Sequence, residues 1–229
     1  MIMKKKKLIY MGKRYDYVVY LSYPGEEQFD ELGKLILNDY LHKHTSIEKN
    51  NLNLKVNRLN DYYASIYIIN KQERVKKRIL VAASDGALFP TVDLAIDANE
   101  NAQSIFEEEG VYGSYGIRDR KLLDNIIEST KHSVYFGEDQ IPSLLRKAAV
   151  YWWKFAHYQV FMNGNKRTGL LVASAFMYLN YMTLDFNQDR MYEISKGIAR
   201  DELTVDDVYG FLLKNTHLTY DRLLRDYLK

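Results

Sequence analysis

The sequence predicts a mainly α-helical domain at residues 90–215, preceded by a small α+β extension at 1–89 and followed by a tail at 216–229. Three observations lead to this prediction. Before residue 90, apolar residues alternate with other residues at several places, which is typical of strands. After it, apolar residues recur every three to four positions, as they do on a helix. The apolar run at 170–179 is long enough to form a buried helix.

Length and composition describe an ordinary globular chain. Its 229 residues can bury a sizeable core, and its hydrophobic share of 47% and charged share of 27% are typical of soluble proteins. The formal net charge of +2 argues neither for nor against a nucleic-acid partner. The chain has no cysteine, which excludes disulfides and thiolate metal sites. Because neither a signal peptide nor a membrane span is recognisable, we expect a cytoplasmic protein that does not bind membranes.

The extension at residues 1–89 is expected to fold into short strands and one helix. Tyr15, Tyr17 and Val19 alternate with other residues as in a strand. Basic clusters at 4–7 and 74–78 fit solvated chain ends and turns, so we do not expect nucleic acid as a partner, although a regulator that uses these clusters is the alternative. The expected elements are two strands within 8–23, a helix at 26–43, a loop or edge strand within 44–60, and strands at 64–69 and 78–82.

The domain at residues 90–215 is expected to consist of helices and one short hairpin. Thr91 is predicted to cap the first helix, and Thr204 to open the last helix through a capping box with Asp207. Glycines at 110, 113 and 116 are interpreted as turn residues. The expected elements are helices at 91–107 and 118–129, a hairpin at 131–139, and helices at 143–158, from about 166 to 179, at 193–200 and at 204–214.

A polar, basic loop at residues 163–169 stands between two apolar helices of this domain. Backbone N–H groups at the start of a helix have no partner within the helix, so they point outward and attract an anion. Lys166 and Arg167 add two positive charges, and the planar fork of Arg167 suits a phosphate. The loop therefore predicts a phosphate site, with an ordinary turn carrying two solvated cations as the alternative.

Read with its flanks, the loop resembles the active-site motif of the Fic/Doc family. Residues 159–168 read Gln-Val-Phe-Met-Asn-Gly-Asn-Lys-Arg-Thr, and the family pattern is His-x-Phe-x-Asp-(Gly/Ala)-Asn-(Lys/Gly)-Arg. Lys166 resembles the Doc (death-on-curing) branch, because the AMP-transferring branch carries glycine there. Residues 112–119 are similar to the start of the family domain, and residues 135–139 to its flap. The resemblance covers roughly residues 90–215 and implies a Fic/Doc-type helical bundle with a short β-hairpin flap.

The resemblance implies a toxin-type transferase. In the family, the loop holds a nucleoside triphosphate, ATP in the first place, together with Mg²⁺. A histidine takes the proton from a Ser, Thr or Tyr hydroxyl of a target protein, which receives a phosphoryl or AMP group. The Doc branch is similar to a kinase that phosphorylates a threonine of translation elongation factor Tu. A separate antitoxin acting in trans is the further partner that the resemblance implies.

The same resemblance gives individual residues a role. Asn165 and Arg167 would hold phosphates, and Gly164 would open the anion hole. Lys166 would block one orientation of the nucleotide, and Phe161 would anchor the loop in the core. The flap would align a target segment as an added strand. The residues of the flap that would contact the target are Val134, Tyr135 and Phe136.

Two positions depart from the family pattern. Gln159 stands at the catalytic histidine and cannot accept a proton near neutral pH. Asn163 stands at the metal-binding aspartate and offers Mg²⁺ only a neutral carbonyl oxygen. A general base contributes about 10²–10⁴-fold to a rate, although positioning and electrostatics dominate phosphoryl transfer. We therefore expect a weakly active or inactive enzyme, with a pseudoenzyme that binds nucleotide or a partner protein as the alternative.

His157 is a second candidate for the missing base, because it lies two residues before Gln159. Two positions on a helix are about 200° apart, so His157 would face away from Gln159 as long as the helix continues. It could take the role only if the helix ends before it. Otherwise it is a core or surface histidine. Trp152 and Trp153 in the same helix are expected in the core rather than at a ligand.

Overall fold

The structure is a computed structural model in which the chain divides into two compact units. The first unit comprises residues 1–87 and 217–229, and the second comprises residues 88–216. The predicted basic cluster at 4–7, the turn glycines before Gly116 and most of the predicted tail lie outside the described residues. The residues that the structure describes are 8–45, 51–105, 116–185 and 187–219.

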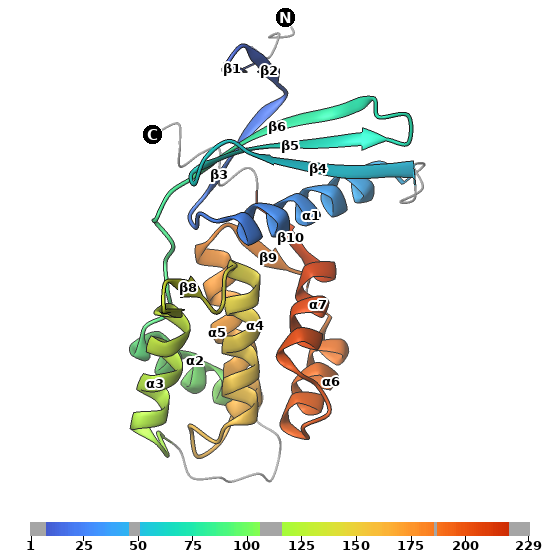
Figure 1. The fold of residues 1–229 in the computed structure, drawn as a ribbon. Coiled ribbons are helices and arrows are strands. Elements are labelled where there is room, and N and C mark those ends of the chain that lie inside the picture. The colour runs from blue at the N-terminus through green and yellow to red at the C-terminus, as the bar shows by residue number, and fades with distance from the viewer. Residues whose placement is uncertain (1–7, 46–50, 106–115, 186, 220–229) are drawn as a thin grey trace, which may run out of the picture. The chain divides into compact units, whose positions relative to one another are not determined.

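The first unit is a four-stranded sheet with one helix against it (Figure 1). Its elements are β1 (Leu8–Tyr10), β2 (Lys13–Tyr15), β3 (Tyr17–Leu21), α1 (Glu26–Lys43), β4 (Leu52–Arg58), β5 (Tyr63–Asn70) and β6 (Val75–Ala83). The strand order is β3-β6-β5-β4, and only the β3–β6 pair is parallel. Phe29, Leu32 and Ile36 of α1 are buried. Gly33 allows a close approach to β4, because a Cβ there would lie 2.7 Å from Leu54 Cδ2.

The strands of this unit are found where the sequence predicts them, with two refinements. Residues 44–60 contain β4, the edge strand that was one of the two alternatives. Residues 8–23 form three strands rather than two, because Asp16 divides the second one. The Asp16 backbone N–H donates to Arg78 O at 2.8 Å, and Arg78 N donates to the Asp16 carboxylate at 2.8 Å. The chain therefore leaves the β1–β2 pair at Asp16 and joins β6.

The second unit is mainly α-helical, as predicted (Figure 1). Its elements are α2 (Val92–Ile105), α3 (Arg120–Lys131), β7 (Val134–Tyr135), β8 (Glu138–Asp139), α4 (Leu144–His157), α5 (Asn165–Leu179), β9 (Met182–Leu184), α6 (Gln188–Ala199) and α7 (Val205–Asn215), after which the chain enters β10 (Thr216–Leu218). Within the described ranges, no helix combines the length and apolar composition needed to cross a membrane.

The helices α4 and α5 form the centre of this unit, and the predicted phosphate loop connects them (Figure 1). Gly169 brings the two backbones close together, since a Cβ there would lie 2.7 Å from the carbonyl oxygen of Trp152. Trp152, Phe155 and Phe176 are fully buried. The predicted core role of Trp152 is therefore confirmed, whereas Trp153 is half-buried and donates from Nε1 to Leu203 O at 2.8 Å.

The helix ends follow the capping residues of the sequence. Thr91 Oγ1 accepts from Leu94 N at 3.1 Å, and Thr204 forms the predicted capping box with Asp207. The helix predicted at 193–200 begins earlier, at Gln188, because Asn187 caps it by accepting from Arg190 N at 3.0 Å. A side chain that offers an oxygen to these first N–H groups fixes where a helix begins.

Candidate active site

The loop before α5 has the geometry of an anion site. Gly164 is the N-cap residue and lies in the left-handed region, with φ 78° and ψ 4°, which glycine adopts without steric cost. The first helical hydrogen bond runs from Thr168 N to Gly164 O at 2.9 Å. The N–H groups of the residues between them therefore have no helical partner. The first turn of α5 contains no acidic residue, so its field favours negative charge.

The side chain of Asn165 closes this loop onto the preceding turn. Its Oδ1 accepts from Phe161 N at 2.8 Å, and its Nδ2 donates to Phe161 O at 2.8 Å. Phe161 is fully buried and stacks on Phe155 with ring centres 6.3 Å apart, so its predicted anchoring role is found. The Asn165 amide thus holds the loop in shape, and a phosphate contact by this side chain would have to replace both bonds.

A second segment, residues 116–119, pairs with the residues before the loop. Met162 N donates to Gly116 O, and Arg118 N donates to Val160 O, both at 2.9 Å. This pairing brings the guanidinium of Arg118 to the exposed side chain of Gln159, where Nη1 donates to Oε1 at 3.2 Å. The position of the family histidine is therefore occupied by an amide that a cation orients.

Asn99 on α2 forms hydrogen bonds with residues on both sides of Gly164. Its Nδ2 donates to Asn163 O and to Thr168 Oγ1, both at 2.9 Å. The Thr168 hydroxyl in turn donates to Gly164 O at 3.0 Å. Asn99 and Thr168 are both buried. Buried hydrogen bonds of this kind fix the direction of the carbonyl and N–H groups around the helix start.

The two basic residues of the motif lie in the first turn of α5 and differ in exposure. Arg167 is half-buried, whereas Lys166 is exposed. The Nζ of Lys166 lies 5.8 Å from the ring centre of Tyr192 on α6, and Lys196 approaches the same ring at 5.5 Å. The ring face attracts both ammonium groups and holds positive charge near the loop.

Asn163, predicted as a weak metal ligand, uses both of its oxygens as hydrogen-bond acceptors. Its Oδ1 accepts from Gly164 N at 2.7 Å, and its backbone oxygen accepts from Asn99. Each oxygen therefore already has one partner within the protein. Magnesium prefers carboxylate oxygens, and among the described residues no group of three His, Cys, Asp or Glu side chains could hold a metal ion.

His157 does not replace the missing base. The helix α4 includes His157, so the helix does not end before this residue, as the role would require. Its ring stacks on Trp153 with centres 4.2 Å apart, and its Nδ1 lies 3.0 Å from Asp201 Oδ1. His157 is therefore a partly exposed surface histidine, which is the alternative given above. The hypothesis that it replaces the missing base is wrong.

The predicted hairpin is present, but its predicted place beside the loop is wrong. β7 and β8 pair around Phe136 and Gly137, whose φ angles are 54° and 84°. Val134, Tyr135 and Phe136 are exposed. The hairpin precedes α4, whereas the loop follows it (Figure 1). At 1.5 Å per residue, the length of α4 separates them by roughly 20 Å, so the flap residues do not face the phosphate site.

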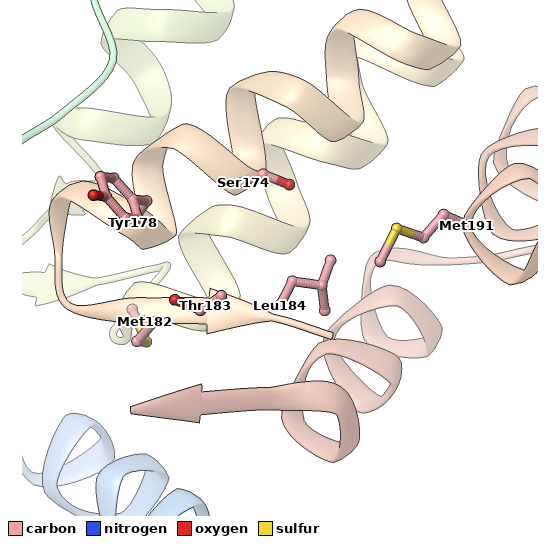
Figure 2. A pocket seen from close by; sticks show the side chains of 6 residues that line it. All are labelled: Ser174, Tyr178, Met182, Thr183, Leu184 and Met191. Atoms are coloured by element: carbon pink, nitrogen blue, oxygen red, sulfur yellow. The ribbon is translucent and has the colours of Figure 1, made fainter. Parts of the chain in front are cut away.

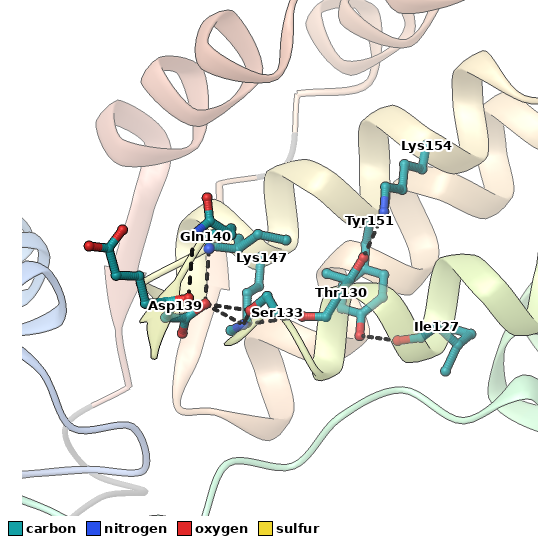
Figure 3. Close-up of polar contacts among 10 residues, drawn as sticks. Ile127, Thr130, Ser133, Asp139, Gln140, Lys147, Tyr151 and Lys154 are labelled. Atoms are coloured by element: carbon teal, nitrogen blue, oxygen red, sulfur yellow. Dashed lines mark hydrogen bonds and ion pairs between the residues drawn. The ribbon is translucent and has the colours of Figure 1, made fainter. Parts of the chain in front are cut away.

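A buried lysine holds the hairpin at this end of α4 (Figure 3). Lys147 Nζ donates to Thr130 O at 3.1 Å and to the Ser133 hydroxyl, and lies 3.6 Å from Asp139 Oδ1. Asp139 also accepts from Ser133 and from Ile141 N. Burial lowers the pKa of Lys147, and the Asp139 carboxylate partly opposes this shift. These contacts explain why the hairpin belongs to the start of α4.

A cavity of about 210 Å³ opens beside the other half of α5 (Figure 2). Its walls come from α5, β9 and α6 and carry no charged side chain. None of the residues predicted for the phosphate site lines it, so it is separate from the loop. Its lining residues are Ser174, Tyr178, Met182, Thr183, Leu184 and Met191.

These features define a helical domain in which a loop with the geometry of an anion site connects two central helices, and comparison with known proteins gives its family. The model of the Fic/DOC family matches residues 92–177, which run from α2 into α5. Toxin Doc of Mycolicibacterium smegmatis (strain ATCC 700084 / mc(2)155) is 32% identical over 98 residues, which are 42% of this chain and 75% of that protein. The chain belongs to the Fic/Doc family.

The hydrogen bonds of Asn99 are not among the predictions, although the residues around Asn99 indicate that its side chain is buried. The buried face of α2 includes Ala95, Asn99 and Ala102, whereas Leu94 is half-buried. A polar residue four positions after a buried alanine lies on the same helix face and indicates a buried hydrogen bond. Arg118 belongs to the segment that is similar to the family, and its spacing in the sequence does not indicate a contact with position 159.

Proposed function

We propose that the loop binds the phosphates of a nucleoside triphosphate, ATP in the first place. The observation that supports this most is the start of α5. There, Gly164 opens a turn of N–H groups without helical partners, Lys166 and Arg167 add charge, and the first turn of α5 itself contains no acidic residue. The Asn165 amide holds this turn in shape before the ligand arrives, which reduces the ordering cost of binding.

We propose further that the protein is a toxin-type transferase with an impaired chemical step. The relative from M. smegmatis is named a toxin, and on that basis we propose an antitoxin acting in trans as a partner. The acceptor is a Ser, Thr or Tyr hydroxyl of a target protein. Its oxygen bonds to the transferred phosphorus, the bond to the leaving phosphate breaks, and the hydroxyl proton passes to solvent because Gln159 cannot accept it.

Each residue of the site has a defined task in this proposal. Arg167 and the N–H groups orient the phosphates, while Arg118 orients the Gln159 amide toward the acceptor hydroxyl. Among the residues that the structure describes, we assign Mg²⁺ no ligand, since Asn163 is engaged with the loop itself. A metal ion bound to the nucleotide would supply charge neutralisation through phosphate and water oxygens.

A second function, that of a pseudoenzyme which binds nucleotide or a partner protein without turnover, is favoured by the same two positions. Gln159 and Asn163 both carry amides, whereas proton transfer at position 159 and metal binding at position 163 need ionisable side chains. Both functions share the loop, so nucleotide binding supports both, and transfer of a labelled group separates them.

The binding test is calorimetric titration of ATP into the full chain, with and without Mg²⁺. We expect Arg167→Ala to weaken binding by about 1.5–3 kcal/mol, the range for a hydrogen bond to a charged group, or about tenfold to a hundredfold. Arg146→Ala is the matched control, because Arg146 pairs with Asp206 at the far end of α4. Absence of ATP binding by the unaltered protein at millimolar nucleotide would contradict the proposal.

The transfer test compares the freshly purified chain with Gln159→His combined with Asn163→Asp. We expect little transfer by the unaltered chain and a substantial increase in the double variant. Arg118 beside position 159 disfavours a protonated imidazole and so keeps the new histidine able to act as a base. Label from γ-labelled ATP on target proteins indicates phosphoryl transfer, and label from α-labelled ATP indicates AMP transfer. Rapid transfer by the unaltered chain would show that Gln159 is no impediment.

A further inference from the structure

The pair Asn163 and Gly164 carries a reactive geometry besides the anion site. It is the only Asn-Gly sequence in the chain. Gly164 N lies 2.7 Å from Asn163 Oδ1 and donates to it. Because Oδ1 is bonded to Cγ, this contact places the backbone nitrogen beside the side-chain carbonyl carbon, which is the atom it attacks when an asparagine cyclises.

We propose that Asn163 converts itself to aspartate, so that the chain generates the acidic side chain that the family motif carries at this position. The Gly164 nitrogen bonds to Cγ, the bond from Cγ to Nδ2 breaks, and the displaced amide nitrogen takes the Gly164 proton and leaves as ammonia. Water then adds to Cγ of the cyclic imide, the bond from Cγ to the Gly164 nitrogen breaks, and aspartate results. One water is consumed, one ammonia is released, and no oxidant or metal is needed.

The surroundings of the pair favour the cyclisation. Attack on Cγ places negative charge on Oδ1, and the helix start with Lys166 and Arg167 stabilises a developing anion at that position. Glycine has no side chain that would obstruct its nitrogen. The left-handed conformation of Gly164, with φ 78°, is one that glycine holds without strain, so the contact is maintained in the folded protein.

The loop also favours aspartate over isoaspartate as the product. Opening of the imide at the backbone carbonyl would insert an additional main-chain carbon into the loop. The Asn163 backbone oxygen is held by Asn99, and the Gly164 oxygen accepts from both the backbone and the hydroxyl of Thr168. A longer main chain would disrupt these bonds, whereas aspartate leaves them in place.

The product has a use that rests on the proposed nucleotide function, although the conversion itself does not. A carboxylate at position 163 is a far better Mg²⁺ ligand than an amide. It also lies among the cations of the loop, which stabilise its charged form. The nucleotide affinity of newly made protein would then depend little on Mg²⁺. In aged protein, Mg²⁺ would strengthen nucleotide binding.

The test is peptide mapping of the full, folded chain after incubation over days at mildly alkaline pH. Trypsin releases residues 155–166, and electron-transfer fragmentation distinguishes aspartate from isoaspartate. We expect a gain of one dalton at Asn163 with aspartate as the main product, while Asn165 in the same peptide stays unchanged. Synthetic peptide 159–169 serves as the reference without the folded loop, and we expect it to convert more slowly and to yield mostly isoaspartate.

Two variants test the assignment. Asn163→Gln keeps an amide but does not form the five-membered imide readily, so we expect no gain in mass there. Lys166→Ala removes one stabilising cation and should slow the conversion. A folded chain that stays unconverted while the peptide reacts would overturn the proposal, as would isoaspartate as the main product. Because mass is read without nucleotide, failure of ATP binding would overturn only the proposed function.

Discussion

Asparagine amides shape the predicted phosphate loop at three positions, and each uses the ability of an amide to donate or accept. Asn165 closes the turn onto Phe161, and Asn163 accepts from the next backbone nitrogen. Asn99 donates to the loop from α2. An ionised aspartate at position 99 could not make these contacts, because a carboxylate has no donor. The site is therefore the start of α5, and amide side chains fix the orientation of its backbone groups.

The first residue-scale prediction concerns Asn99. Asn99→Ala removes the donor of both Asn163 O and Thr168 Oγ1, which leaves a partly buried and a buried acceptor without it and costs about 1–3 kcal/mol of stability. We expect ATP binding to weaken several-fold as well, because the helix start is no longer held in one orientation. Calorimetric titration together with chemical unfolding measures the two effects.

Asn180 provides the matched control at the opposite end of α5. It is as buried as Asn99, and its Nδ2 donates to Leu88 O and Phe176 O, both at 2.8 Å. We expect Asn180→Ala to lower stability by a similar amount while ATP affinity stays unchanged. If both variants weakened ATP binding equally, Asn99 would act through general stability alone.

The central element of the second unit is the close pair of α4 and α5. The pair places the loop at one end, and only a glycine at position 169 permits this distance. A methyl group at Gly169 would lie 2.7 Å from the backbone oxygen of Trp152 and 3.2 Å from the nitrogen of Ala156. These are backbone atoms that cannot rotate away, so the two helices would have to separate.

We therefore expect Gly169→Ala to destabilise the protein by about 1–3 kcal/mol, the range for overpacking a core. Gly210→Ala is the matched control within α7, since a Cβ there meets nothing within 4 Å. Replacing a helical glycine in open space should stabilise the protein by about 0.5–1 kcal/mol. Urea unfolding of both variants gives opposite signs if the close approach matters, and equal signs would contradict it.

The sequence predicts those elements whose beginning is determined by neighbouring residues. Thr91 and Thr204 cap helices as predicted, and Gly164 with the residues after it begins α5 where the motif indicated. Contacts between distant segments were not predictable, because Asn99 and Asn163 lie 64 residues apart and no spacing rule joins them. The sequence predicts the hairpin beside the loop, whereas the structure has it at the other end of α4, because the contacts of the buried Lys147 cannot be predicted from residue spacing.

The whole molecule consists of two units, each with its own buried side chains. Ile66 is fully buried in the sheet of the first unit, and Phe176 is fully buried on α5 of the second. The loop and the residues that hold it, including Asn99 and Arg118, belong to the second unit. Nucleotide binding should therefore depend on the core of that unit.

We expect Ile66→Ala to destabilise the first unit by about 2–5 kcal/mol, as for large-to-small changes in a core, without changing ATP affinity. Phe176→Ala should cost about 3–5 kcal/mol and weaken ATP binding as the second unit loosens. Calorimetric titration below the unfolding temperature, together with thermal unfolding, measures both. Loss of binding in Ile66→Ala would mean that the loop depends on the first unit.

The position of the exposed hairpin tip sets a minimum length for any molecule that contacts both the tip and the loop. The tip and the loop lie at opposite ends of α4, roughly 20 Å apart, a distance that needs about six extended residues to cross. A short peptide centred on one hydroxyl would reach only one of the two places. A protein that contacts both Phe136 and the loop must span this distance, so peptides shorter than about six residues could not reproduce such a contact.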